Sequence, residues 1–189
     1  MIRARIWGAT VFVDYSTRGV KVNIMQDTPG GSTLEAKEAF EHDLMTRNVV
    51  PKHYHADNGK FVENTFNQDF EIKMQHLTFC GVGAHQQNGV SERIIKDLNL
   101  FLHNLVLHAQ RFWPEYITTM LWPFALVASA DKMNNLHVDM NGKTPEMKFS
   151  DSIGSTTRLS NFHNFCYPVY ILDSRLQSVG EGGPTKWDP

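Results

Sequence analysis

The chain has 189 residues, which favours one ordinary domain with a short extension over a multidomain enzyme. Its 18 basic and 20 acidic side chains give a net charge of −2, so bulk positive charge does not hold it to nucleic acid, although a local basic surface could. The cysteines are Cys80 and Cys166, which are too few for a disulfide framework or a four-cysteine zinc site. No apolar run reaches the length of a membrane span or a signal segment, so neither is expected.

The first half of the sequence predicts a hairpin followed by alternating helices and strands. Residues 11–15 and 20–24 are rich in β-formers, and the turn residues between them favour a hairpin. Ser32 and Glu35 have the spacing of a helix capping box. The sequence then predicts a helix over 32–47, a strand over 49–56, a short helix over 62–70 and a strand over 76–80.

The second half begins with a glycine-rich segment, residues 81–89, which we expect to be a mobile loop. The strongest predicted helix follows over 91–110, with a buried stripe made of Ile94, Ile95, Leu98, Leu102, Leu105, Val106 and Ala109. Trp113 and Pro114 are predicted to open a last long helix that Pro123 kinks. Beyond it we expect one helical turn over 144–149, a strand over 165–172 and a loose segment over 180–184.

This order of elements is typical of a layered α/β domain. We place the domain in residues 1–150, and a post-core extension with one strand and a loose tail in residues 151–189. In such a domain Asp57 ends a strand and Glu92 begins a helix. Function has to be argued from these side chains and not from the layers.

Asp57 and Glu92 could together hold a divalent cation. Residues 58–91 separate them, and carboxylate oxygens are the ligands that magnesium prefers. A two-metal centre could activate a water or hydroxyl and stabilise the leaving oxygen of a phosphodiester, but it normally needs a third carboxylate. Each residue also has an ordinary role, since an aspartate before Asn-Gly forms turns and a glutamate in a first helical turn favours the helix dipole.

Several ordered segments resemble the integrase core of copia-type retroelements. Residues 55–61 read H-A-D-N-G-K-F, which resembles the family's S-D-N-G-x-x-F, and residues 86–93 read Q-Q-N-G-V-S-E-R, which resembles Q-x-N-G-x-x-E-R. Residues 12–16 (F-V-D-Y-S) are similar to F-I-D-D-Y-S-R. Residues 142–146 (G-K-T-P-E) and 166–170 (C-Y-P-V-Y) resemble the later segments G-x-T-P-x-E-L and F-G-C-x-A/P-Y-V. The resemblance covers about residues 8 to 175.

This resemblance implies a ribonuclease H-like α/β fold, in which helices flank a mixed sheet, and a DNA-integration function. The family's second catalytic aspartate falls on Asp57 and its catalytic glutamate on Glu92. The family uses Mg²⁺ or Mn²⁺ and cuts and joins DNA by two-metal phosphoryl transfer. The implied partners are retroelement ends, target DNA and further copies of the chain in a homo-oligomer, with no membrane. The implied location is the nucleus or an intracellular particle.

Residues around Glu92 fall where such integrases contact DNA. Lys96 matches a DNA-contacting lysine, although as an i,i+4 neighbour it could equally pair with Glu92. Gln87 and Asn88 lie where the loop would touch a DNA end, although amides are also ordinary in a glycine-rich loop. With Arg93, which could add a phosphate contact, the predicted DNA-binding residues are Lys96, Arg93, Gln87 and Asn88.

Two other groups of side chains admit a binding role or an ordinary one. Seven basic residues either line a DNA path or belong to a mixed surface: Lys37, Arg47, Lys52, Lys60, Arg93, Lys96 and Arg111. His53 and His55 alternate before Asp57 and either form a metal site with His85 or serve structural and surface roles. No H-x3–5-H with C-x2-C spacing occurs, so the zinc-binding module of integrases is not expected in this chain.

The segment around Asp14 departs from the family pattern. It matches the family's second strand, whereas the first catalytic aspartate lies on the strand before. No acidic residue precedes Asp14. We therefore expect a core that is incomplete at its N-terminus and lacks its first strand, with Asp14 on the solvent or turn side and outside the metal shell.

Three functions follow from these patterns. The first is the core of a copia-type integrase. The second is a catalytically dead or co-opted remnant that binds nucleic acid or protein. The third is an unrelated ribonuclease H-like nuclease, which the N-G-V-S-E-R segment disfavours. The resemblance implies a polynucleotidyl transferase, but without the first catalytic aspartate the question of enzymatic activity stays open.

Overall fold

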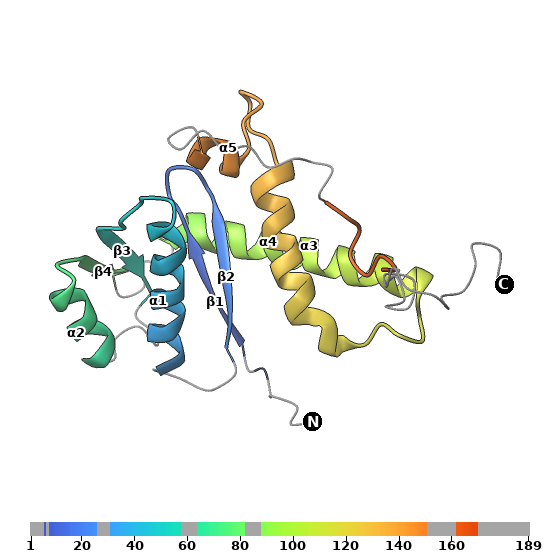
Figure 1. Cartoon of the computed structure of the whole chain (residues 1–189), viewed down its shortest axis with the longest axis horizontal. Coiled ribbons are helices and arrows are strands. Elements are labelled where there is room, and N and C mark those ends of the chain that lie inside the picture. The colour runs from blue at the N-terminus through green and yellow to red at the C-terminus, as the bar shows by residue number, and fades with distance from the viewer. Residues whose placement is uncertain are drawn as a thin grey trace, which may run out of the picture.

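The computed structural model describes residues 6, 8–25, 31–57, 64–81, 88–150 and 162–169. It has a mixed α/β architecture, as the sequence predicts (Figure 1). In chain order its elements are β1 (Gly8–Val13), β2 (Val20–Met25), α1 (Gly31–Met45), β3 (His53–Ala56), α2 (Asn64–Ile72), β4 (His76–Phe79), α3 (Gly89–Phe112), the 3-10 turn η3 (Thr119–Leu121), α4 (Trp122–Leu136) and α5 (Pro145–Ser150). None of the helices in the described residues is long and apolar enough to cross a membrane.

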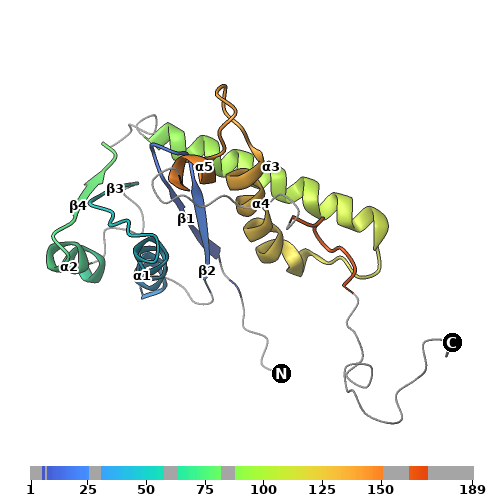
Figure 2. The same cartoon turned by 45° about the horizontal axis from the view of Figure 1, so that its top comes forward.

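The β1–β2 hairpin stands between two helical layers. Its strands are antiparallel, with Gly8 opposite Met25 and Val13 opposite Val20. Figures 1 and 2 both show α1 on one face of the hairpin, with α3 and α4 on the other. Because successive side chains of a strand point to opposite faces, one strand can supply both interfaces. The predicted hairpin is confirmed.

The alternation along β2 explains how both faces are covered. Val20 and Val22 are buried in the core against α3 and α4. Lys21 and Asn23 point the other way, toward α1: the Lys21 ammonium pairs with Asp43 at 3.1 Å, and the Asn23 amide donates to a backbone carbonyl of α1. The hairpin is therefore fixed by apolar packing on one face and by polar contacts on the other.

The main core joins the hairpin to the two long helices. Its buried members are Val20, Val22, Ile94, Leu98, Leu126, Ala130 and Met133. Fully burying one aliphatic side chain of this kind contributes about 1.5–3 kcal/mol. The buried stripe of α3 is narrower than predicted, because only Ile94, Leu98 and Ala109 are buried whereas Ile95 is 39% exposed.

The strands β3 and β4 form a second, parallel pair. His53 lies opposite His76 and Ala56 opposite Phe79. Among the described residues this pair and the β1–β2 hairpin are separate two-stranded sheets, with no ladder between them. The single mixed sheet expected from the sequence is thus seen as two halves.

The connection between α3 and α4 differs from the prediction of one long, kinked helix. Residues 113–118 are irregular, and Pro123 lies in the first turn of α4. The first N–H groups of a helix have no partner within that helix, so proline is tolerated there and does not kink a continuous helix.

The prediction of a strand over 165–172 is wrong for residues 165–169, which are the part of this segment that the structure describes. Residues 162–169 contain a turn and no strand. Cys166 has a φ of 59°, in the left-handed region that strands do not use, and the amide of Tyr167 donates to the carbonyl of Asn164 at 3.1 Å. The remainder of that segment, and the segment over 180–184, lie outside the described residues.

Asn134 of α4 anchors the start of β2, and its removal tests this part of the fold. Its side chain accepts from the Val20 amide at 2.8 Å and donates to the Val20 carbonyl at 2.7 Å. We expect Asn134→Ala to lower the free energy of unfolding by about 1–3 kcal/mol, because buried backbone groups lose their partners. The neighbouring Asn135, whose side-chain amide donates to the Asp131 carbonyl of its own helix, provides the control Asn135→Ala. Equal losses for the two variants in urea unfolding would contradict this role.

Candidate functional site

The two predicted catalytic carboxylates lie at element ends. Asp57 directly follows β3, and its side chain is exposed. Glu92 lies in the first turn of α3 and is also exposed. Figure 2 shows α3 beginning on the side of the molecule where β3 and β4 lie. The expected strand-end and helix-start positions are confirmed, while a shared cation stays a prediction.

The first turns of α3 carry the predicted DNA-binding side chains. Asn88 is the N-cap residue, and its side chain makes no capping hydrogen bond. Arg93 and Lys96 are exposed. In the described part of the chain no ion pair joins Lys96 to Glu92, so the alternative role of this lysine is not seen. Gln87 lies outside the described residues.

Asp14 belongs to the hairpin turn. Its Oδ2 accepts hydrogen bonds from the Thr17 amide at 2.7 Å, the Thr17 hydroxyl at 2.6 Å and the Ser16 hydroxyl at 2.8 Å. Burial acts to raise the pKa of Asp14, but these hydrogen bonds outweigh it and leave the pKa below its usual value. The turn-side position expected for Asp14 is confirmed.

The exposed face of the β3–β4 pair carries imidazole groups. The Thr78 hydroxyl oxygen lies 2.8 Å from His53 Nε2 and 2.9 Å from His55 Nδ1. His55 Nε2 also lies 3.3 Å from Cys80 Sγ. His85, the third member of the alternative metal site, lies outside the described residues. The two strand histidines are thus held by side chains of β4 and the residue that follows it.

Metal binding depends on how many ligands converge. Within the described ranges, no group of three or more His, Cys, Asp or Glu side chains is arranged to hold a metal ion. Asp57 and Glu92 offer carboxylate oxygens, which are the ligands that Mg²⁺ prefers, but two carboxylates alone do not make a complete magnesium site. We therefore assign no reaction step to a metal held by the described residues alone.

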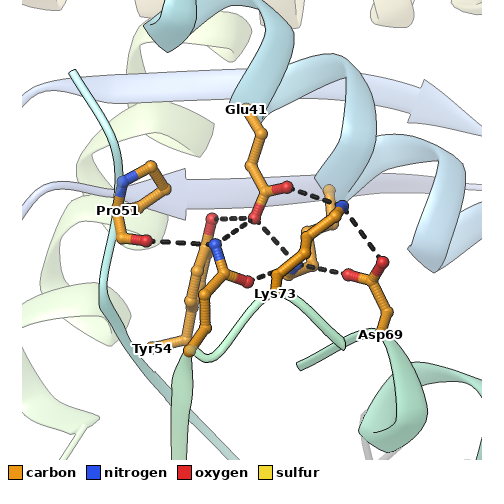
Figure 3. A network of polar contacts seen from close by, with 7 residues as sticks. Glu41, Pro51, Tyr54, Asp69 and Lys73 are labelled. Carbon is orange, nitrogen blue, oxygen red and sulfur yellow. Dashed lines mark hydrogen bonds and ion pairs between the residues drawn. The ribbon is translucent and has the colours of Figure 1, made fainter. Parts of the chain in front are cut away.

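A buried charge network beneath β3 was missed by the sequence analysis (Figure 3). Lys37 of α1 has no exposed side-chain surface. Its ammonium contacts Glu41 at 2.7 Å, Asp69 at 2.5 Å and the side-chain oxygen Oε1 of Gln75 at 2.7 Å. An ammonium has three donors, so all of them are used. Its nitrogen also lies 4.3 Å from the centre of the Phe70 ring.

Glu41 is the second hub of this network. It accepts from the Tyr54 hydroxyl at 2.9 Å, from Gln75 at 2.8 Å and from Lys73 at 2.8 Å. Burial acts to raise the pKa of Glu41, but hydrogen bonds from Lys37 and the other donors lower it to about 2. The Glu41 carboxylate is therefore held ionised. Burial and then the charge of Glu41 raise the pKa of the Tyr54 hydroxyl.

This network corrects the predicted DNA path. Lys37 is buried and cannot reach a phosphate. Arg47 pairs with Glu146 of α5 at 2.9 Å. The i,i+4 spacing of Lys37 and Glu41 was the available signal. That spacing is equally common on exposed helix faces, and whether this face of α1 is buried cannot be read from the spacing alone.

Comparison with solved structures identifies the class of fold. The BIV integrase catalytic core matches 78% of this chain and 93% of its own, with a TM-score of 0.53 and 20% identity. The HTLV-2 integrase core, solved with magnesium in a trimeric form, matches 73% of this chain and 81% of its own, with a TM-score of 0.51 and 21% identity. A chain of the simian T-cell lymphotropic virus intasome with the PP2A regulatory subunit B56 gamma matches 86% of this chain and 52% of its own, with a TM-score of 0.55 and 20% identity. This chain has the fold of a retroviral integrase catalytic core.

Likeness in sequence is weaker than likeness in fold. No protein-family profile matches the sequence, and no curated protein is significantly similar to it. The HTLV-2 core has also been solved with magnesium in a dimeric form, with a TM-score of 0.51.

The low pKa of Glu41 predicts how stability depends on pH. Because the folded-state pKa is depressed from 4.5 to about 2, the stabilisation by this carboxylate is present above pH 4.5 and is lost as pH falls toward 2. Glu41→Gln cannot ionise, so the difference in free energy of unfolding between wild type and this variant should be largest above pH 4.5 and should narrow below it.

Denaturant unfolding across this pH range checks the prediction. Asp43→Asn is the matched control, because it removes a carboxylate of the same helix that pairs with Lys21 at the surface. Its effect should be below about 1 kcal/mol at every pH. A gap for Glu41→Gln that stays constant across the range would show that the ionised form of Glu41 is not what the network stabilises.

Proposed function

We propose that this chain is the core of a copia-type retroelement integrase that binds DNA. The observation that carries the proposal is the agreement of two independent features. The fold is that of an integrase core, and the two segments that resemble integrase motifs place Asp57 at a strand end and Glu92 at a helix start. The proposed location is the nucleus or an intracellular particle.

Asp57 and Glu92 are proposed as two of the carboxylates that hold Mg²⁺ or Mn²⁺. When bound, such ions activate the attacking hydroxyl and stabilise the leaving oxygen of a phosphodiester. Asp57 would contribute its oxygen ligands from the end of β3, and Glu92 from the first turn of α3. Both are exposed, so a hydrated ion can reach them. A magnesium complex is known for the HTLV-2 neighbour, which supports this choice of ion.

A third carboxylate is proposed to come from a strand between β1 and β3. The separation of the two pairs among the described residues leaves one edge of β1 and one edge of β3 without a strand partner. Unpaired backbone groups are costly when buried, and exposed edges favour aggregation. A strand inserted there would join the two pairs into one mixed sheet and could bring the first catalytic aspartate beside Asp57.

Arg93 and Lys96 are proposed to contact DNA phosphates, together with Gln87 and Asn88 at the preceding loop. Arg93 and Lys96 are exposed on the helix that carries Glu92. Phosphate contacts need only charge and position, so they do not depend on a complete metal site. A homo-oligomer is also proposed, with the dimeric and trimeric forms of the HTLV-2 core as support.

A catalytically dead or co-opted remnant that binds nucleic acid or protein is the second candidate. The observation that favours it is the missing third ligand among the described residues. Incubation of the chain with Mn²⁺ and a labelled duplex of element-end sequence separates the two. Joined product that disappears in Asp57→Asn supports catalysis. Where no product forms, a Mn²⁺ site that is lost in Asp57→Asn supports an integrase core that needs its third carboxylate, and DNA binding without a Mn²⁺ site supports the remnant.

The proposed phosphate contacts predict a change in the salt dependence of DNA binding. Lys96→Ala should weaken binding to a labelled duplex and reduce the slope of log affinity against log salt by about one. The double variant Arg93→Ala with Lys96→Ala should reduce it further. Fluorescence anisotropy between about 50 and 200 mM salt measures both quantities.

Arg111→Ala provides the control for this experiment. Arg111 is an exposed basic residue in the last turn of the same helix. Its removal changes the net charge as Lys96→Ala does, but at the opposite end of α3. Equal loss of salt dependence in the two single variants would mean that DNA binding follows charge along the whole of α3, and the proposed restriction of the phosphate contacts to its first turns would be wrong.

A further inference from the structure

The β3–β4 pair needs something other than a backbone ladder to fix its place. Among the described residues it shares no strand pairing with the hairpin. The hairpin, in turn, carries α3 through the core of Val22, Ile94 and Leu98. Asp57 and Glu92 therefore stand on two parts of the molecule whose relative position depends on side chains.

The network around Lys37 and Glu41 connects these two parts. Glu41 holds the hydroxyl of Tyr54, which lies in β3 three residues before Asp57. Gln75, itself bound to Glu41, donates to the carbonyl of Pro51 at 3.0 Å, just before β3 begins. The network therefore holds the chain by hydrogen bonds at Pro51, before the strand, and at Tyr54, within it (Figure 3).

The helix α1, which carries Lys37 and Glu41, itself packs against the hairpin. The rings of Phe12 in β1 and Phe40 in α1 stack with centroids 4.5 Å apart. The Tyr54 ring also meets Phe12 edge-on at 6.5 Å. A continuous path of contacts therefore runs from β3 through Glu41 and α1 to the hairpin, and from the hairpin to α3.

We propose that Glu41, Lys37 and Tyr54 are positioning residues for Asp57. They set the place of β3 relative to α3, and so the separation of the two carboxylates. The role of those carboxylates rests on the proposed function, whereas the coupling of β3 to α1 does not. Ligands lie about 2.0–2.6 Å from a bound cation, so a displacement of about 1 Å between the two elements matters.

A purely stabilising network would behave differently from a positioning one. Loss of stability alone lowers the melting temperature, yet the molecules that are still folded keep the same separation between β3 and α3. Loss of positioning changes that separation in folded molecules. The test therefore measures a distance and not only a melting curve.

Pulsed electron–electron resonance between two spin labels measures this separation. Lys52→Cys, directly before β3, and Asn99→Cys on α3 are suitable label sites, because both side chains are exposed. Cys80→Ala and Cys166→Ala remove the natural thiols from the full chain. Distances are recorded well below the melting temperature, on samples whose circular dichroism matches that of the labelled parent.

Tyr54→Phe is the gentlest variant, because it removes one hydroxyl and keeps the ring that packs against Phe12 and Phe70. Glu41→Gln removes the charge and keeps the shape. Both should shift the distance peak by about 1 Å or broaden it by as much. Lys148→Met is the control, since its ion pair with Asp139 touches neither α1 nor β3. It should leave the distribution unchanged.

Distributions for Tyr54→Phe and Glu41→Gln that superimpose on the parent would overturn the proposal. If Glu41→Gln does not fold, Tyr54→Phe alone decides the question. Failure of the proposed function has a different signature. In that case the parent binds no Mn²⁺ in a titration, while the distance changes in the variants still show that the network positions β3.

Discussion

The ammonium of Lys37 is cut off from water, and the fold around it is arranged to supply its acceptors. Glu41, Asp69 and Gln75 come from α1, α2 and the segment before β4, so satisfying one buried charge draws three separate stretches of chain together. Removing one partner of such a buried pair typically costs about 3–5 kcal/mol, because it leaves the other charge uncompensated. Among the described residues this network ties the β3–β4 pair to α1, and the contact of the Tyr54 ring with Phe12 adds a second attachment.

Local patterns predicted the elements well and their contacts poorly. The hairpin, α1, α2 and α3 follow from β-propensity and helical spacing within short windows. Pro123 was misjudged because a proline favours either a kink or a helix start, and the choice depends on whether the preceding residues are helical. The burial of Lys37 depends on α2, which begins more than twenty residues later, so no local window contains it.

The candidate site shows the same division. The sequence motifs placed Asp57 after a strand and Glu92 in a first helical turn, and the structure has both residues in these positions. Asp14 was expected on the solvent or turn side because its segment resembles the family's second strand, and Thr17 holds its carboxylate in the hairpin turn. Its place outside a metal shell stays a prediction. Whether the carboxylates converge depends on how the strands are ordered in space, which no local window of the sequence determines.

Mn²⁺ binding to single-site variants tests the central claim most directly, because Asp57 and Glu92 are proposed to share one cation. Electron paramagnetic resonance of free Mn²⁺ measures the affinity without requiring catalysis. The account predicts one weak site that is lost in Asp57→Asn and in Glu92→Gln and is kept in Asp14→Asn. Binding that survives both Asp57→Asn and Glu92→Gln, or that disappears in Asp14→Asn, would contradict it.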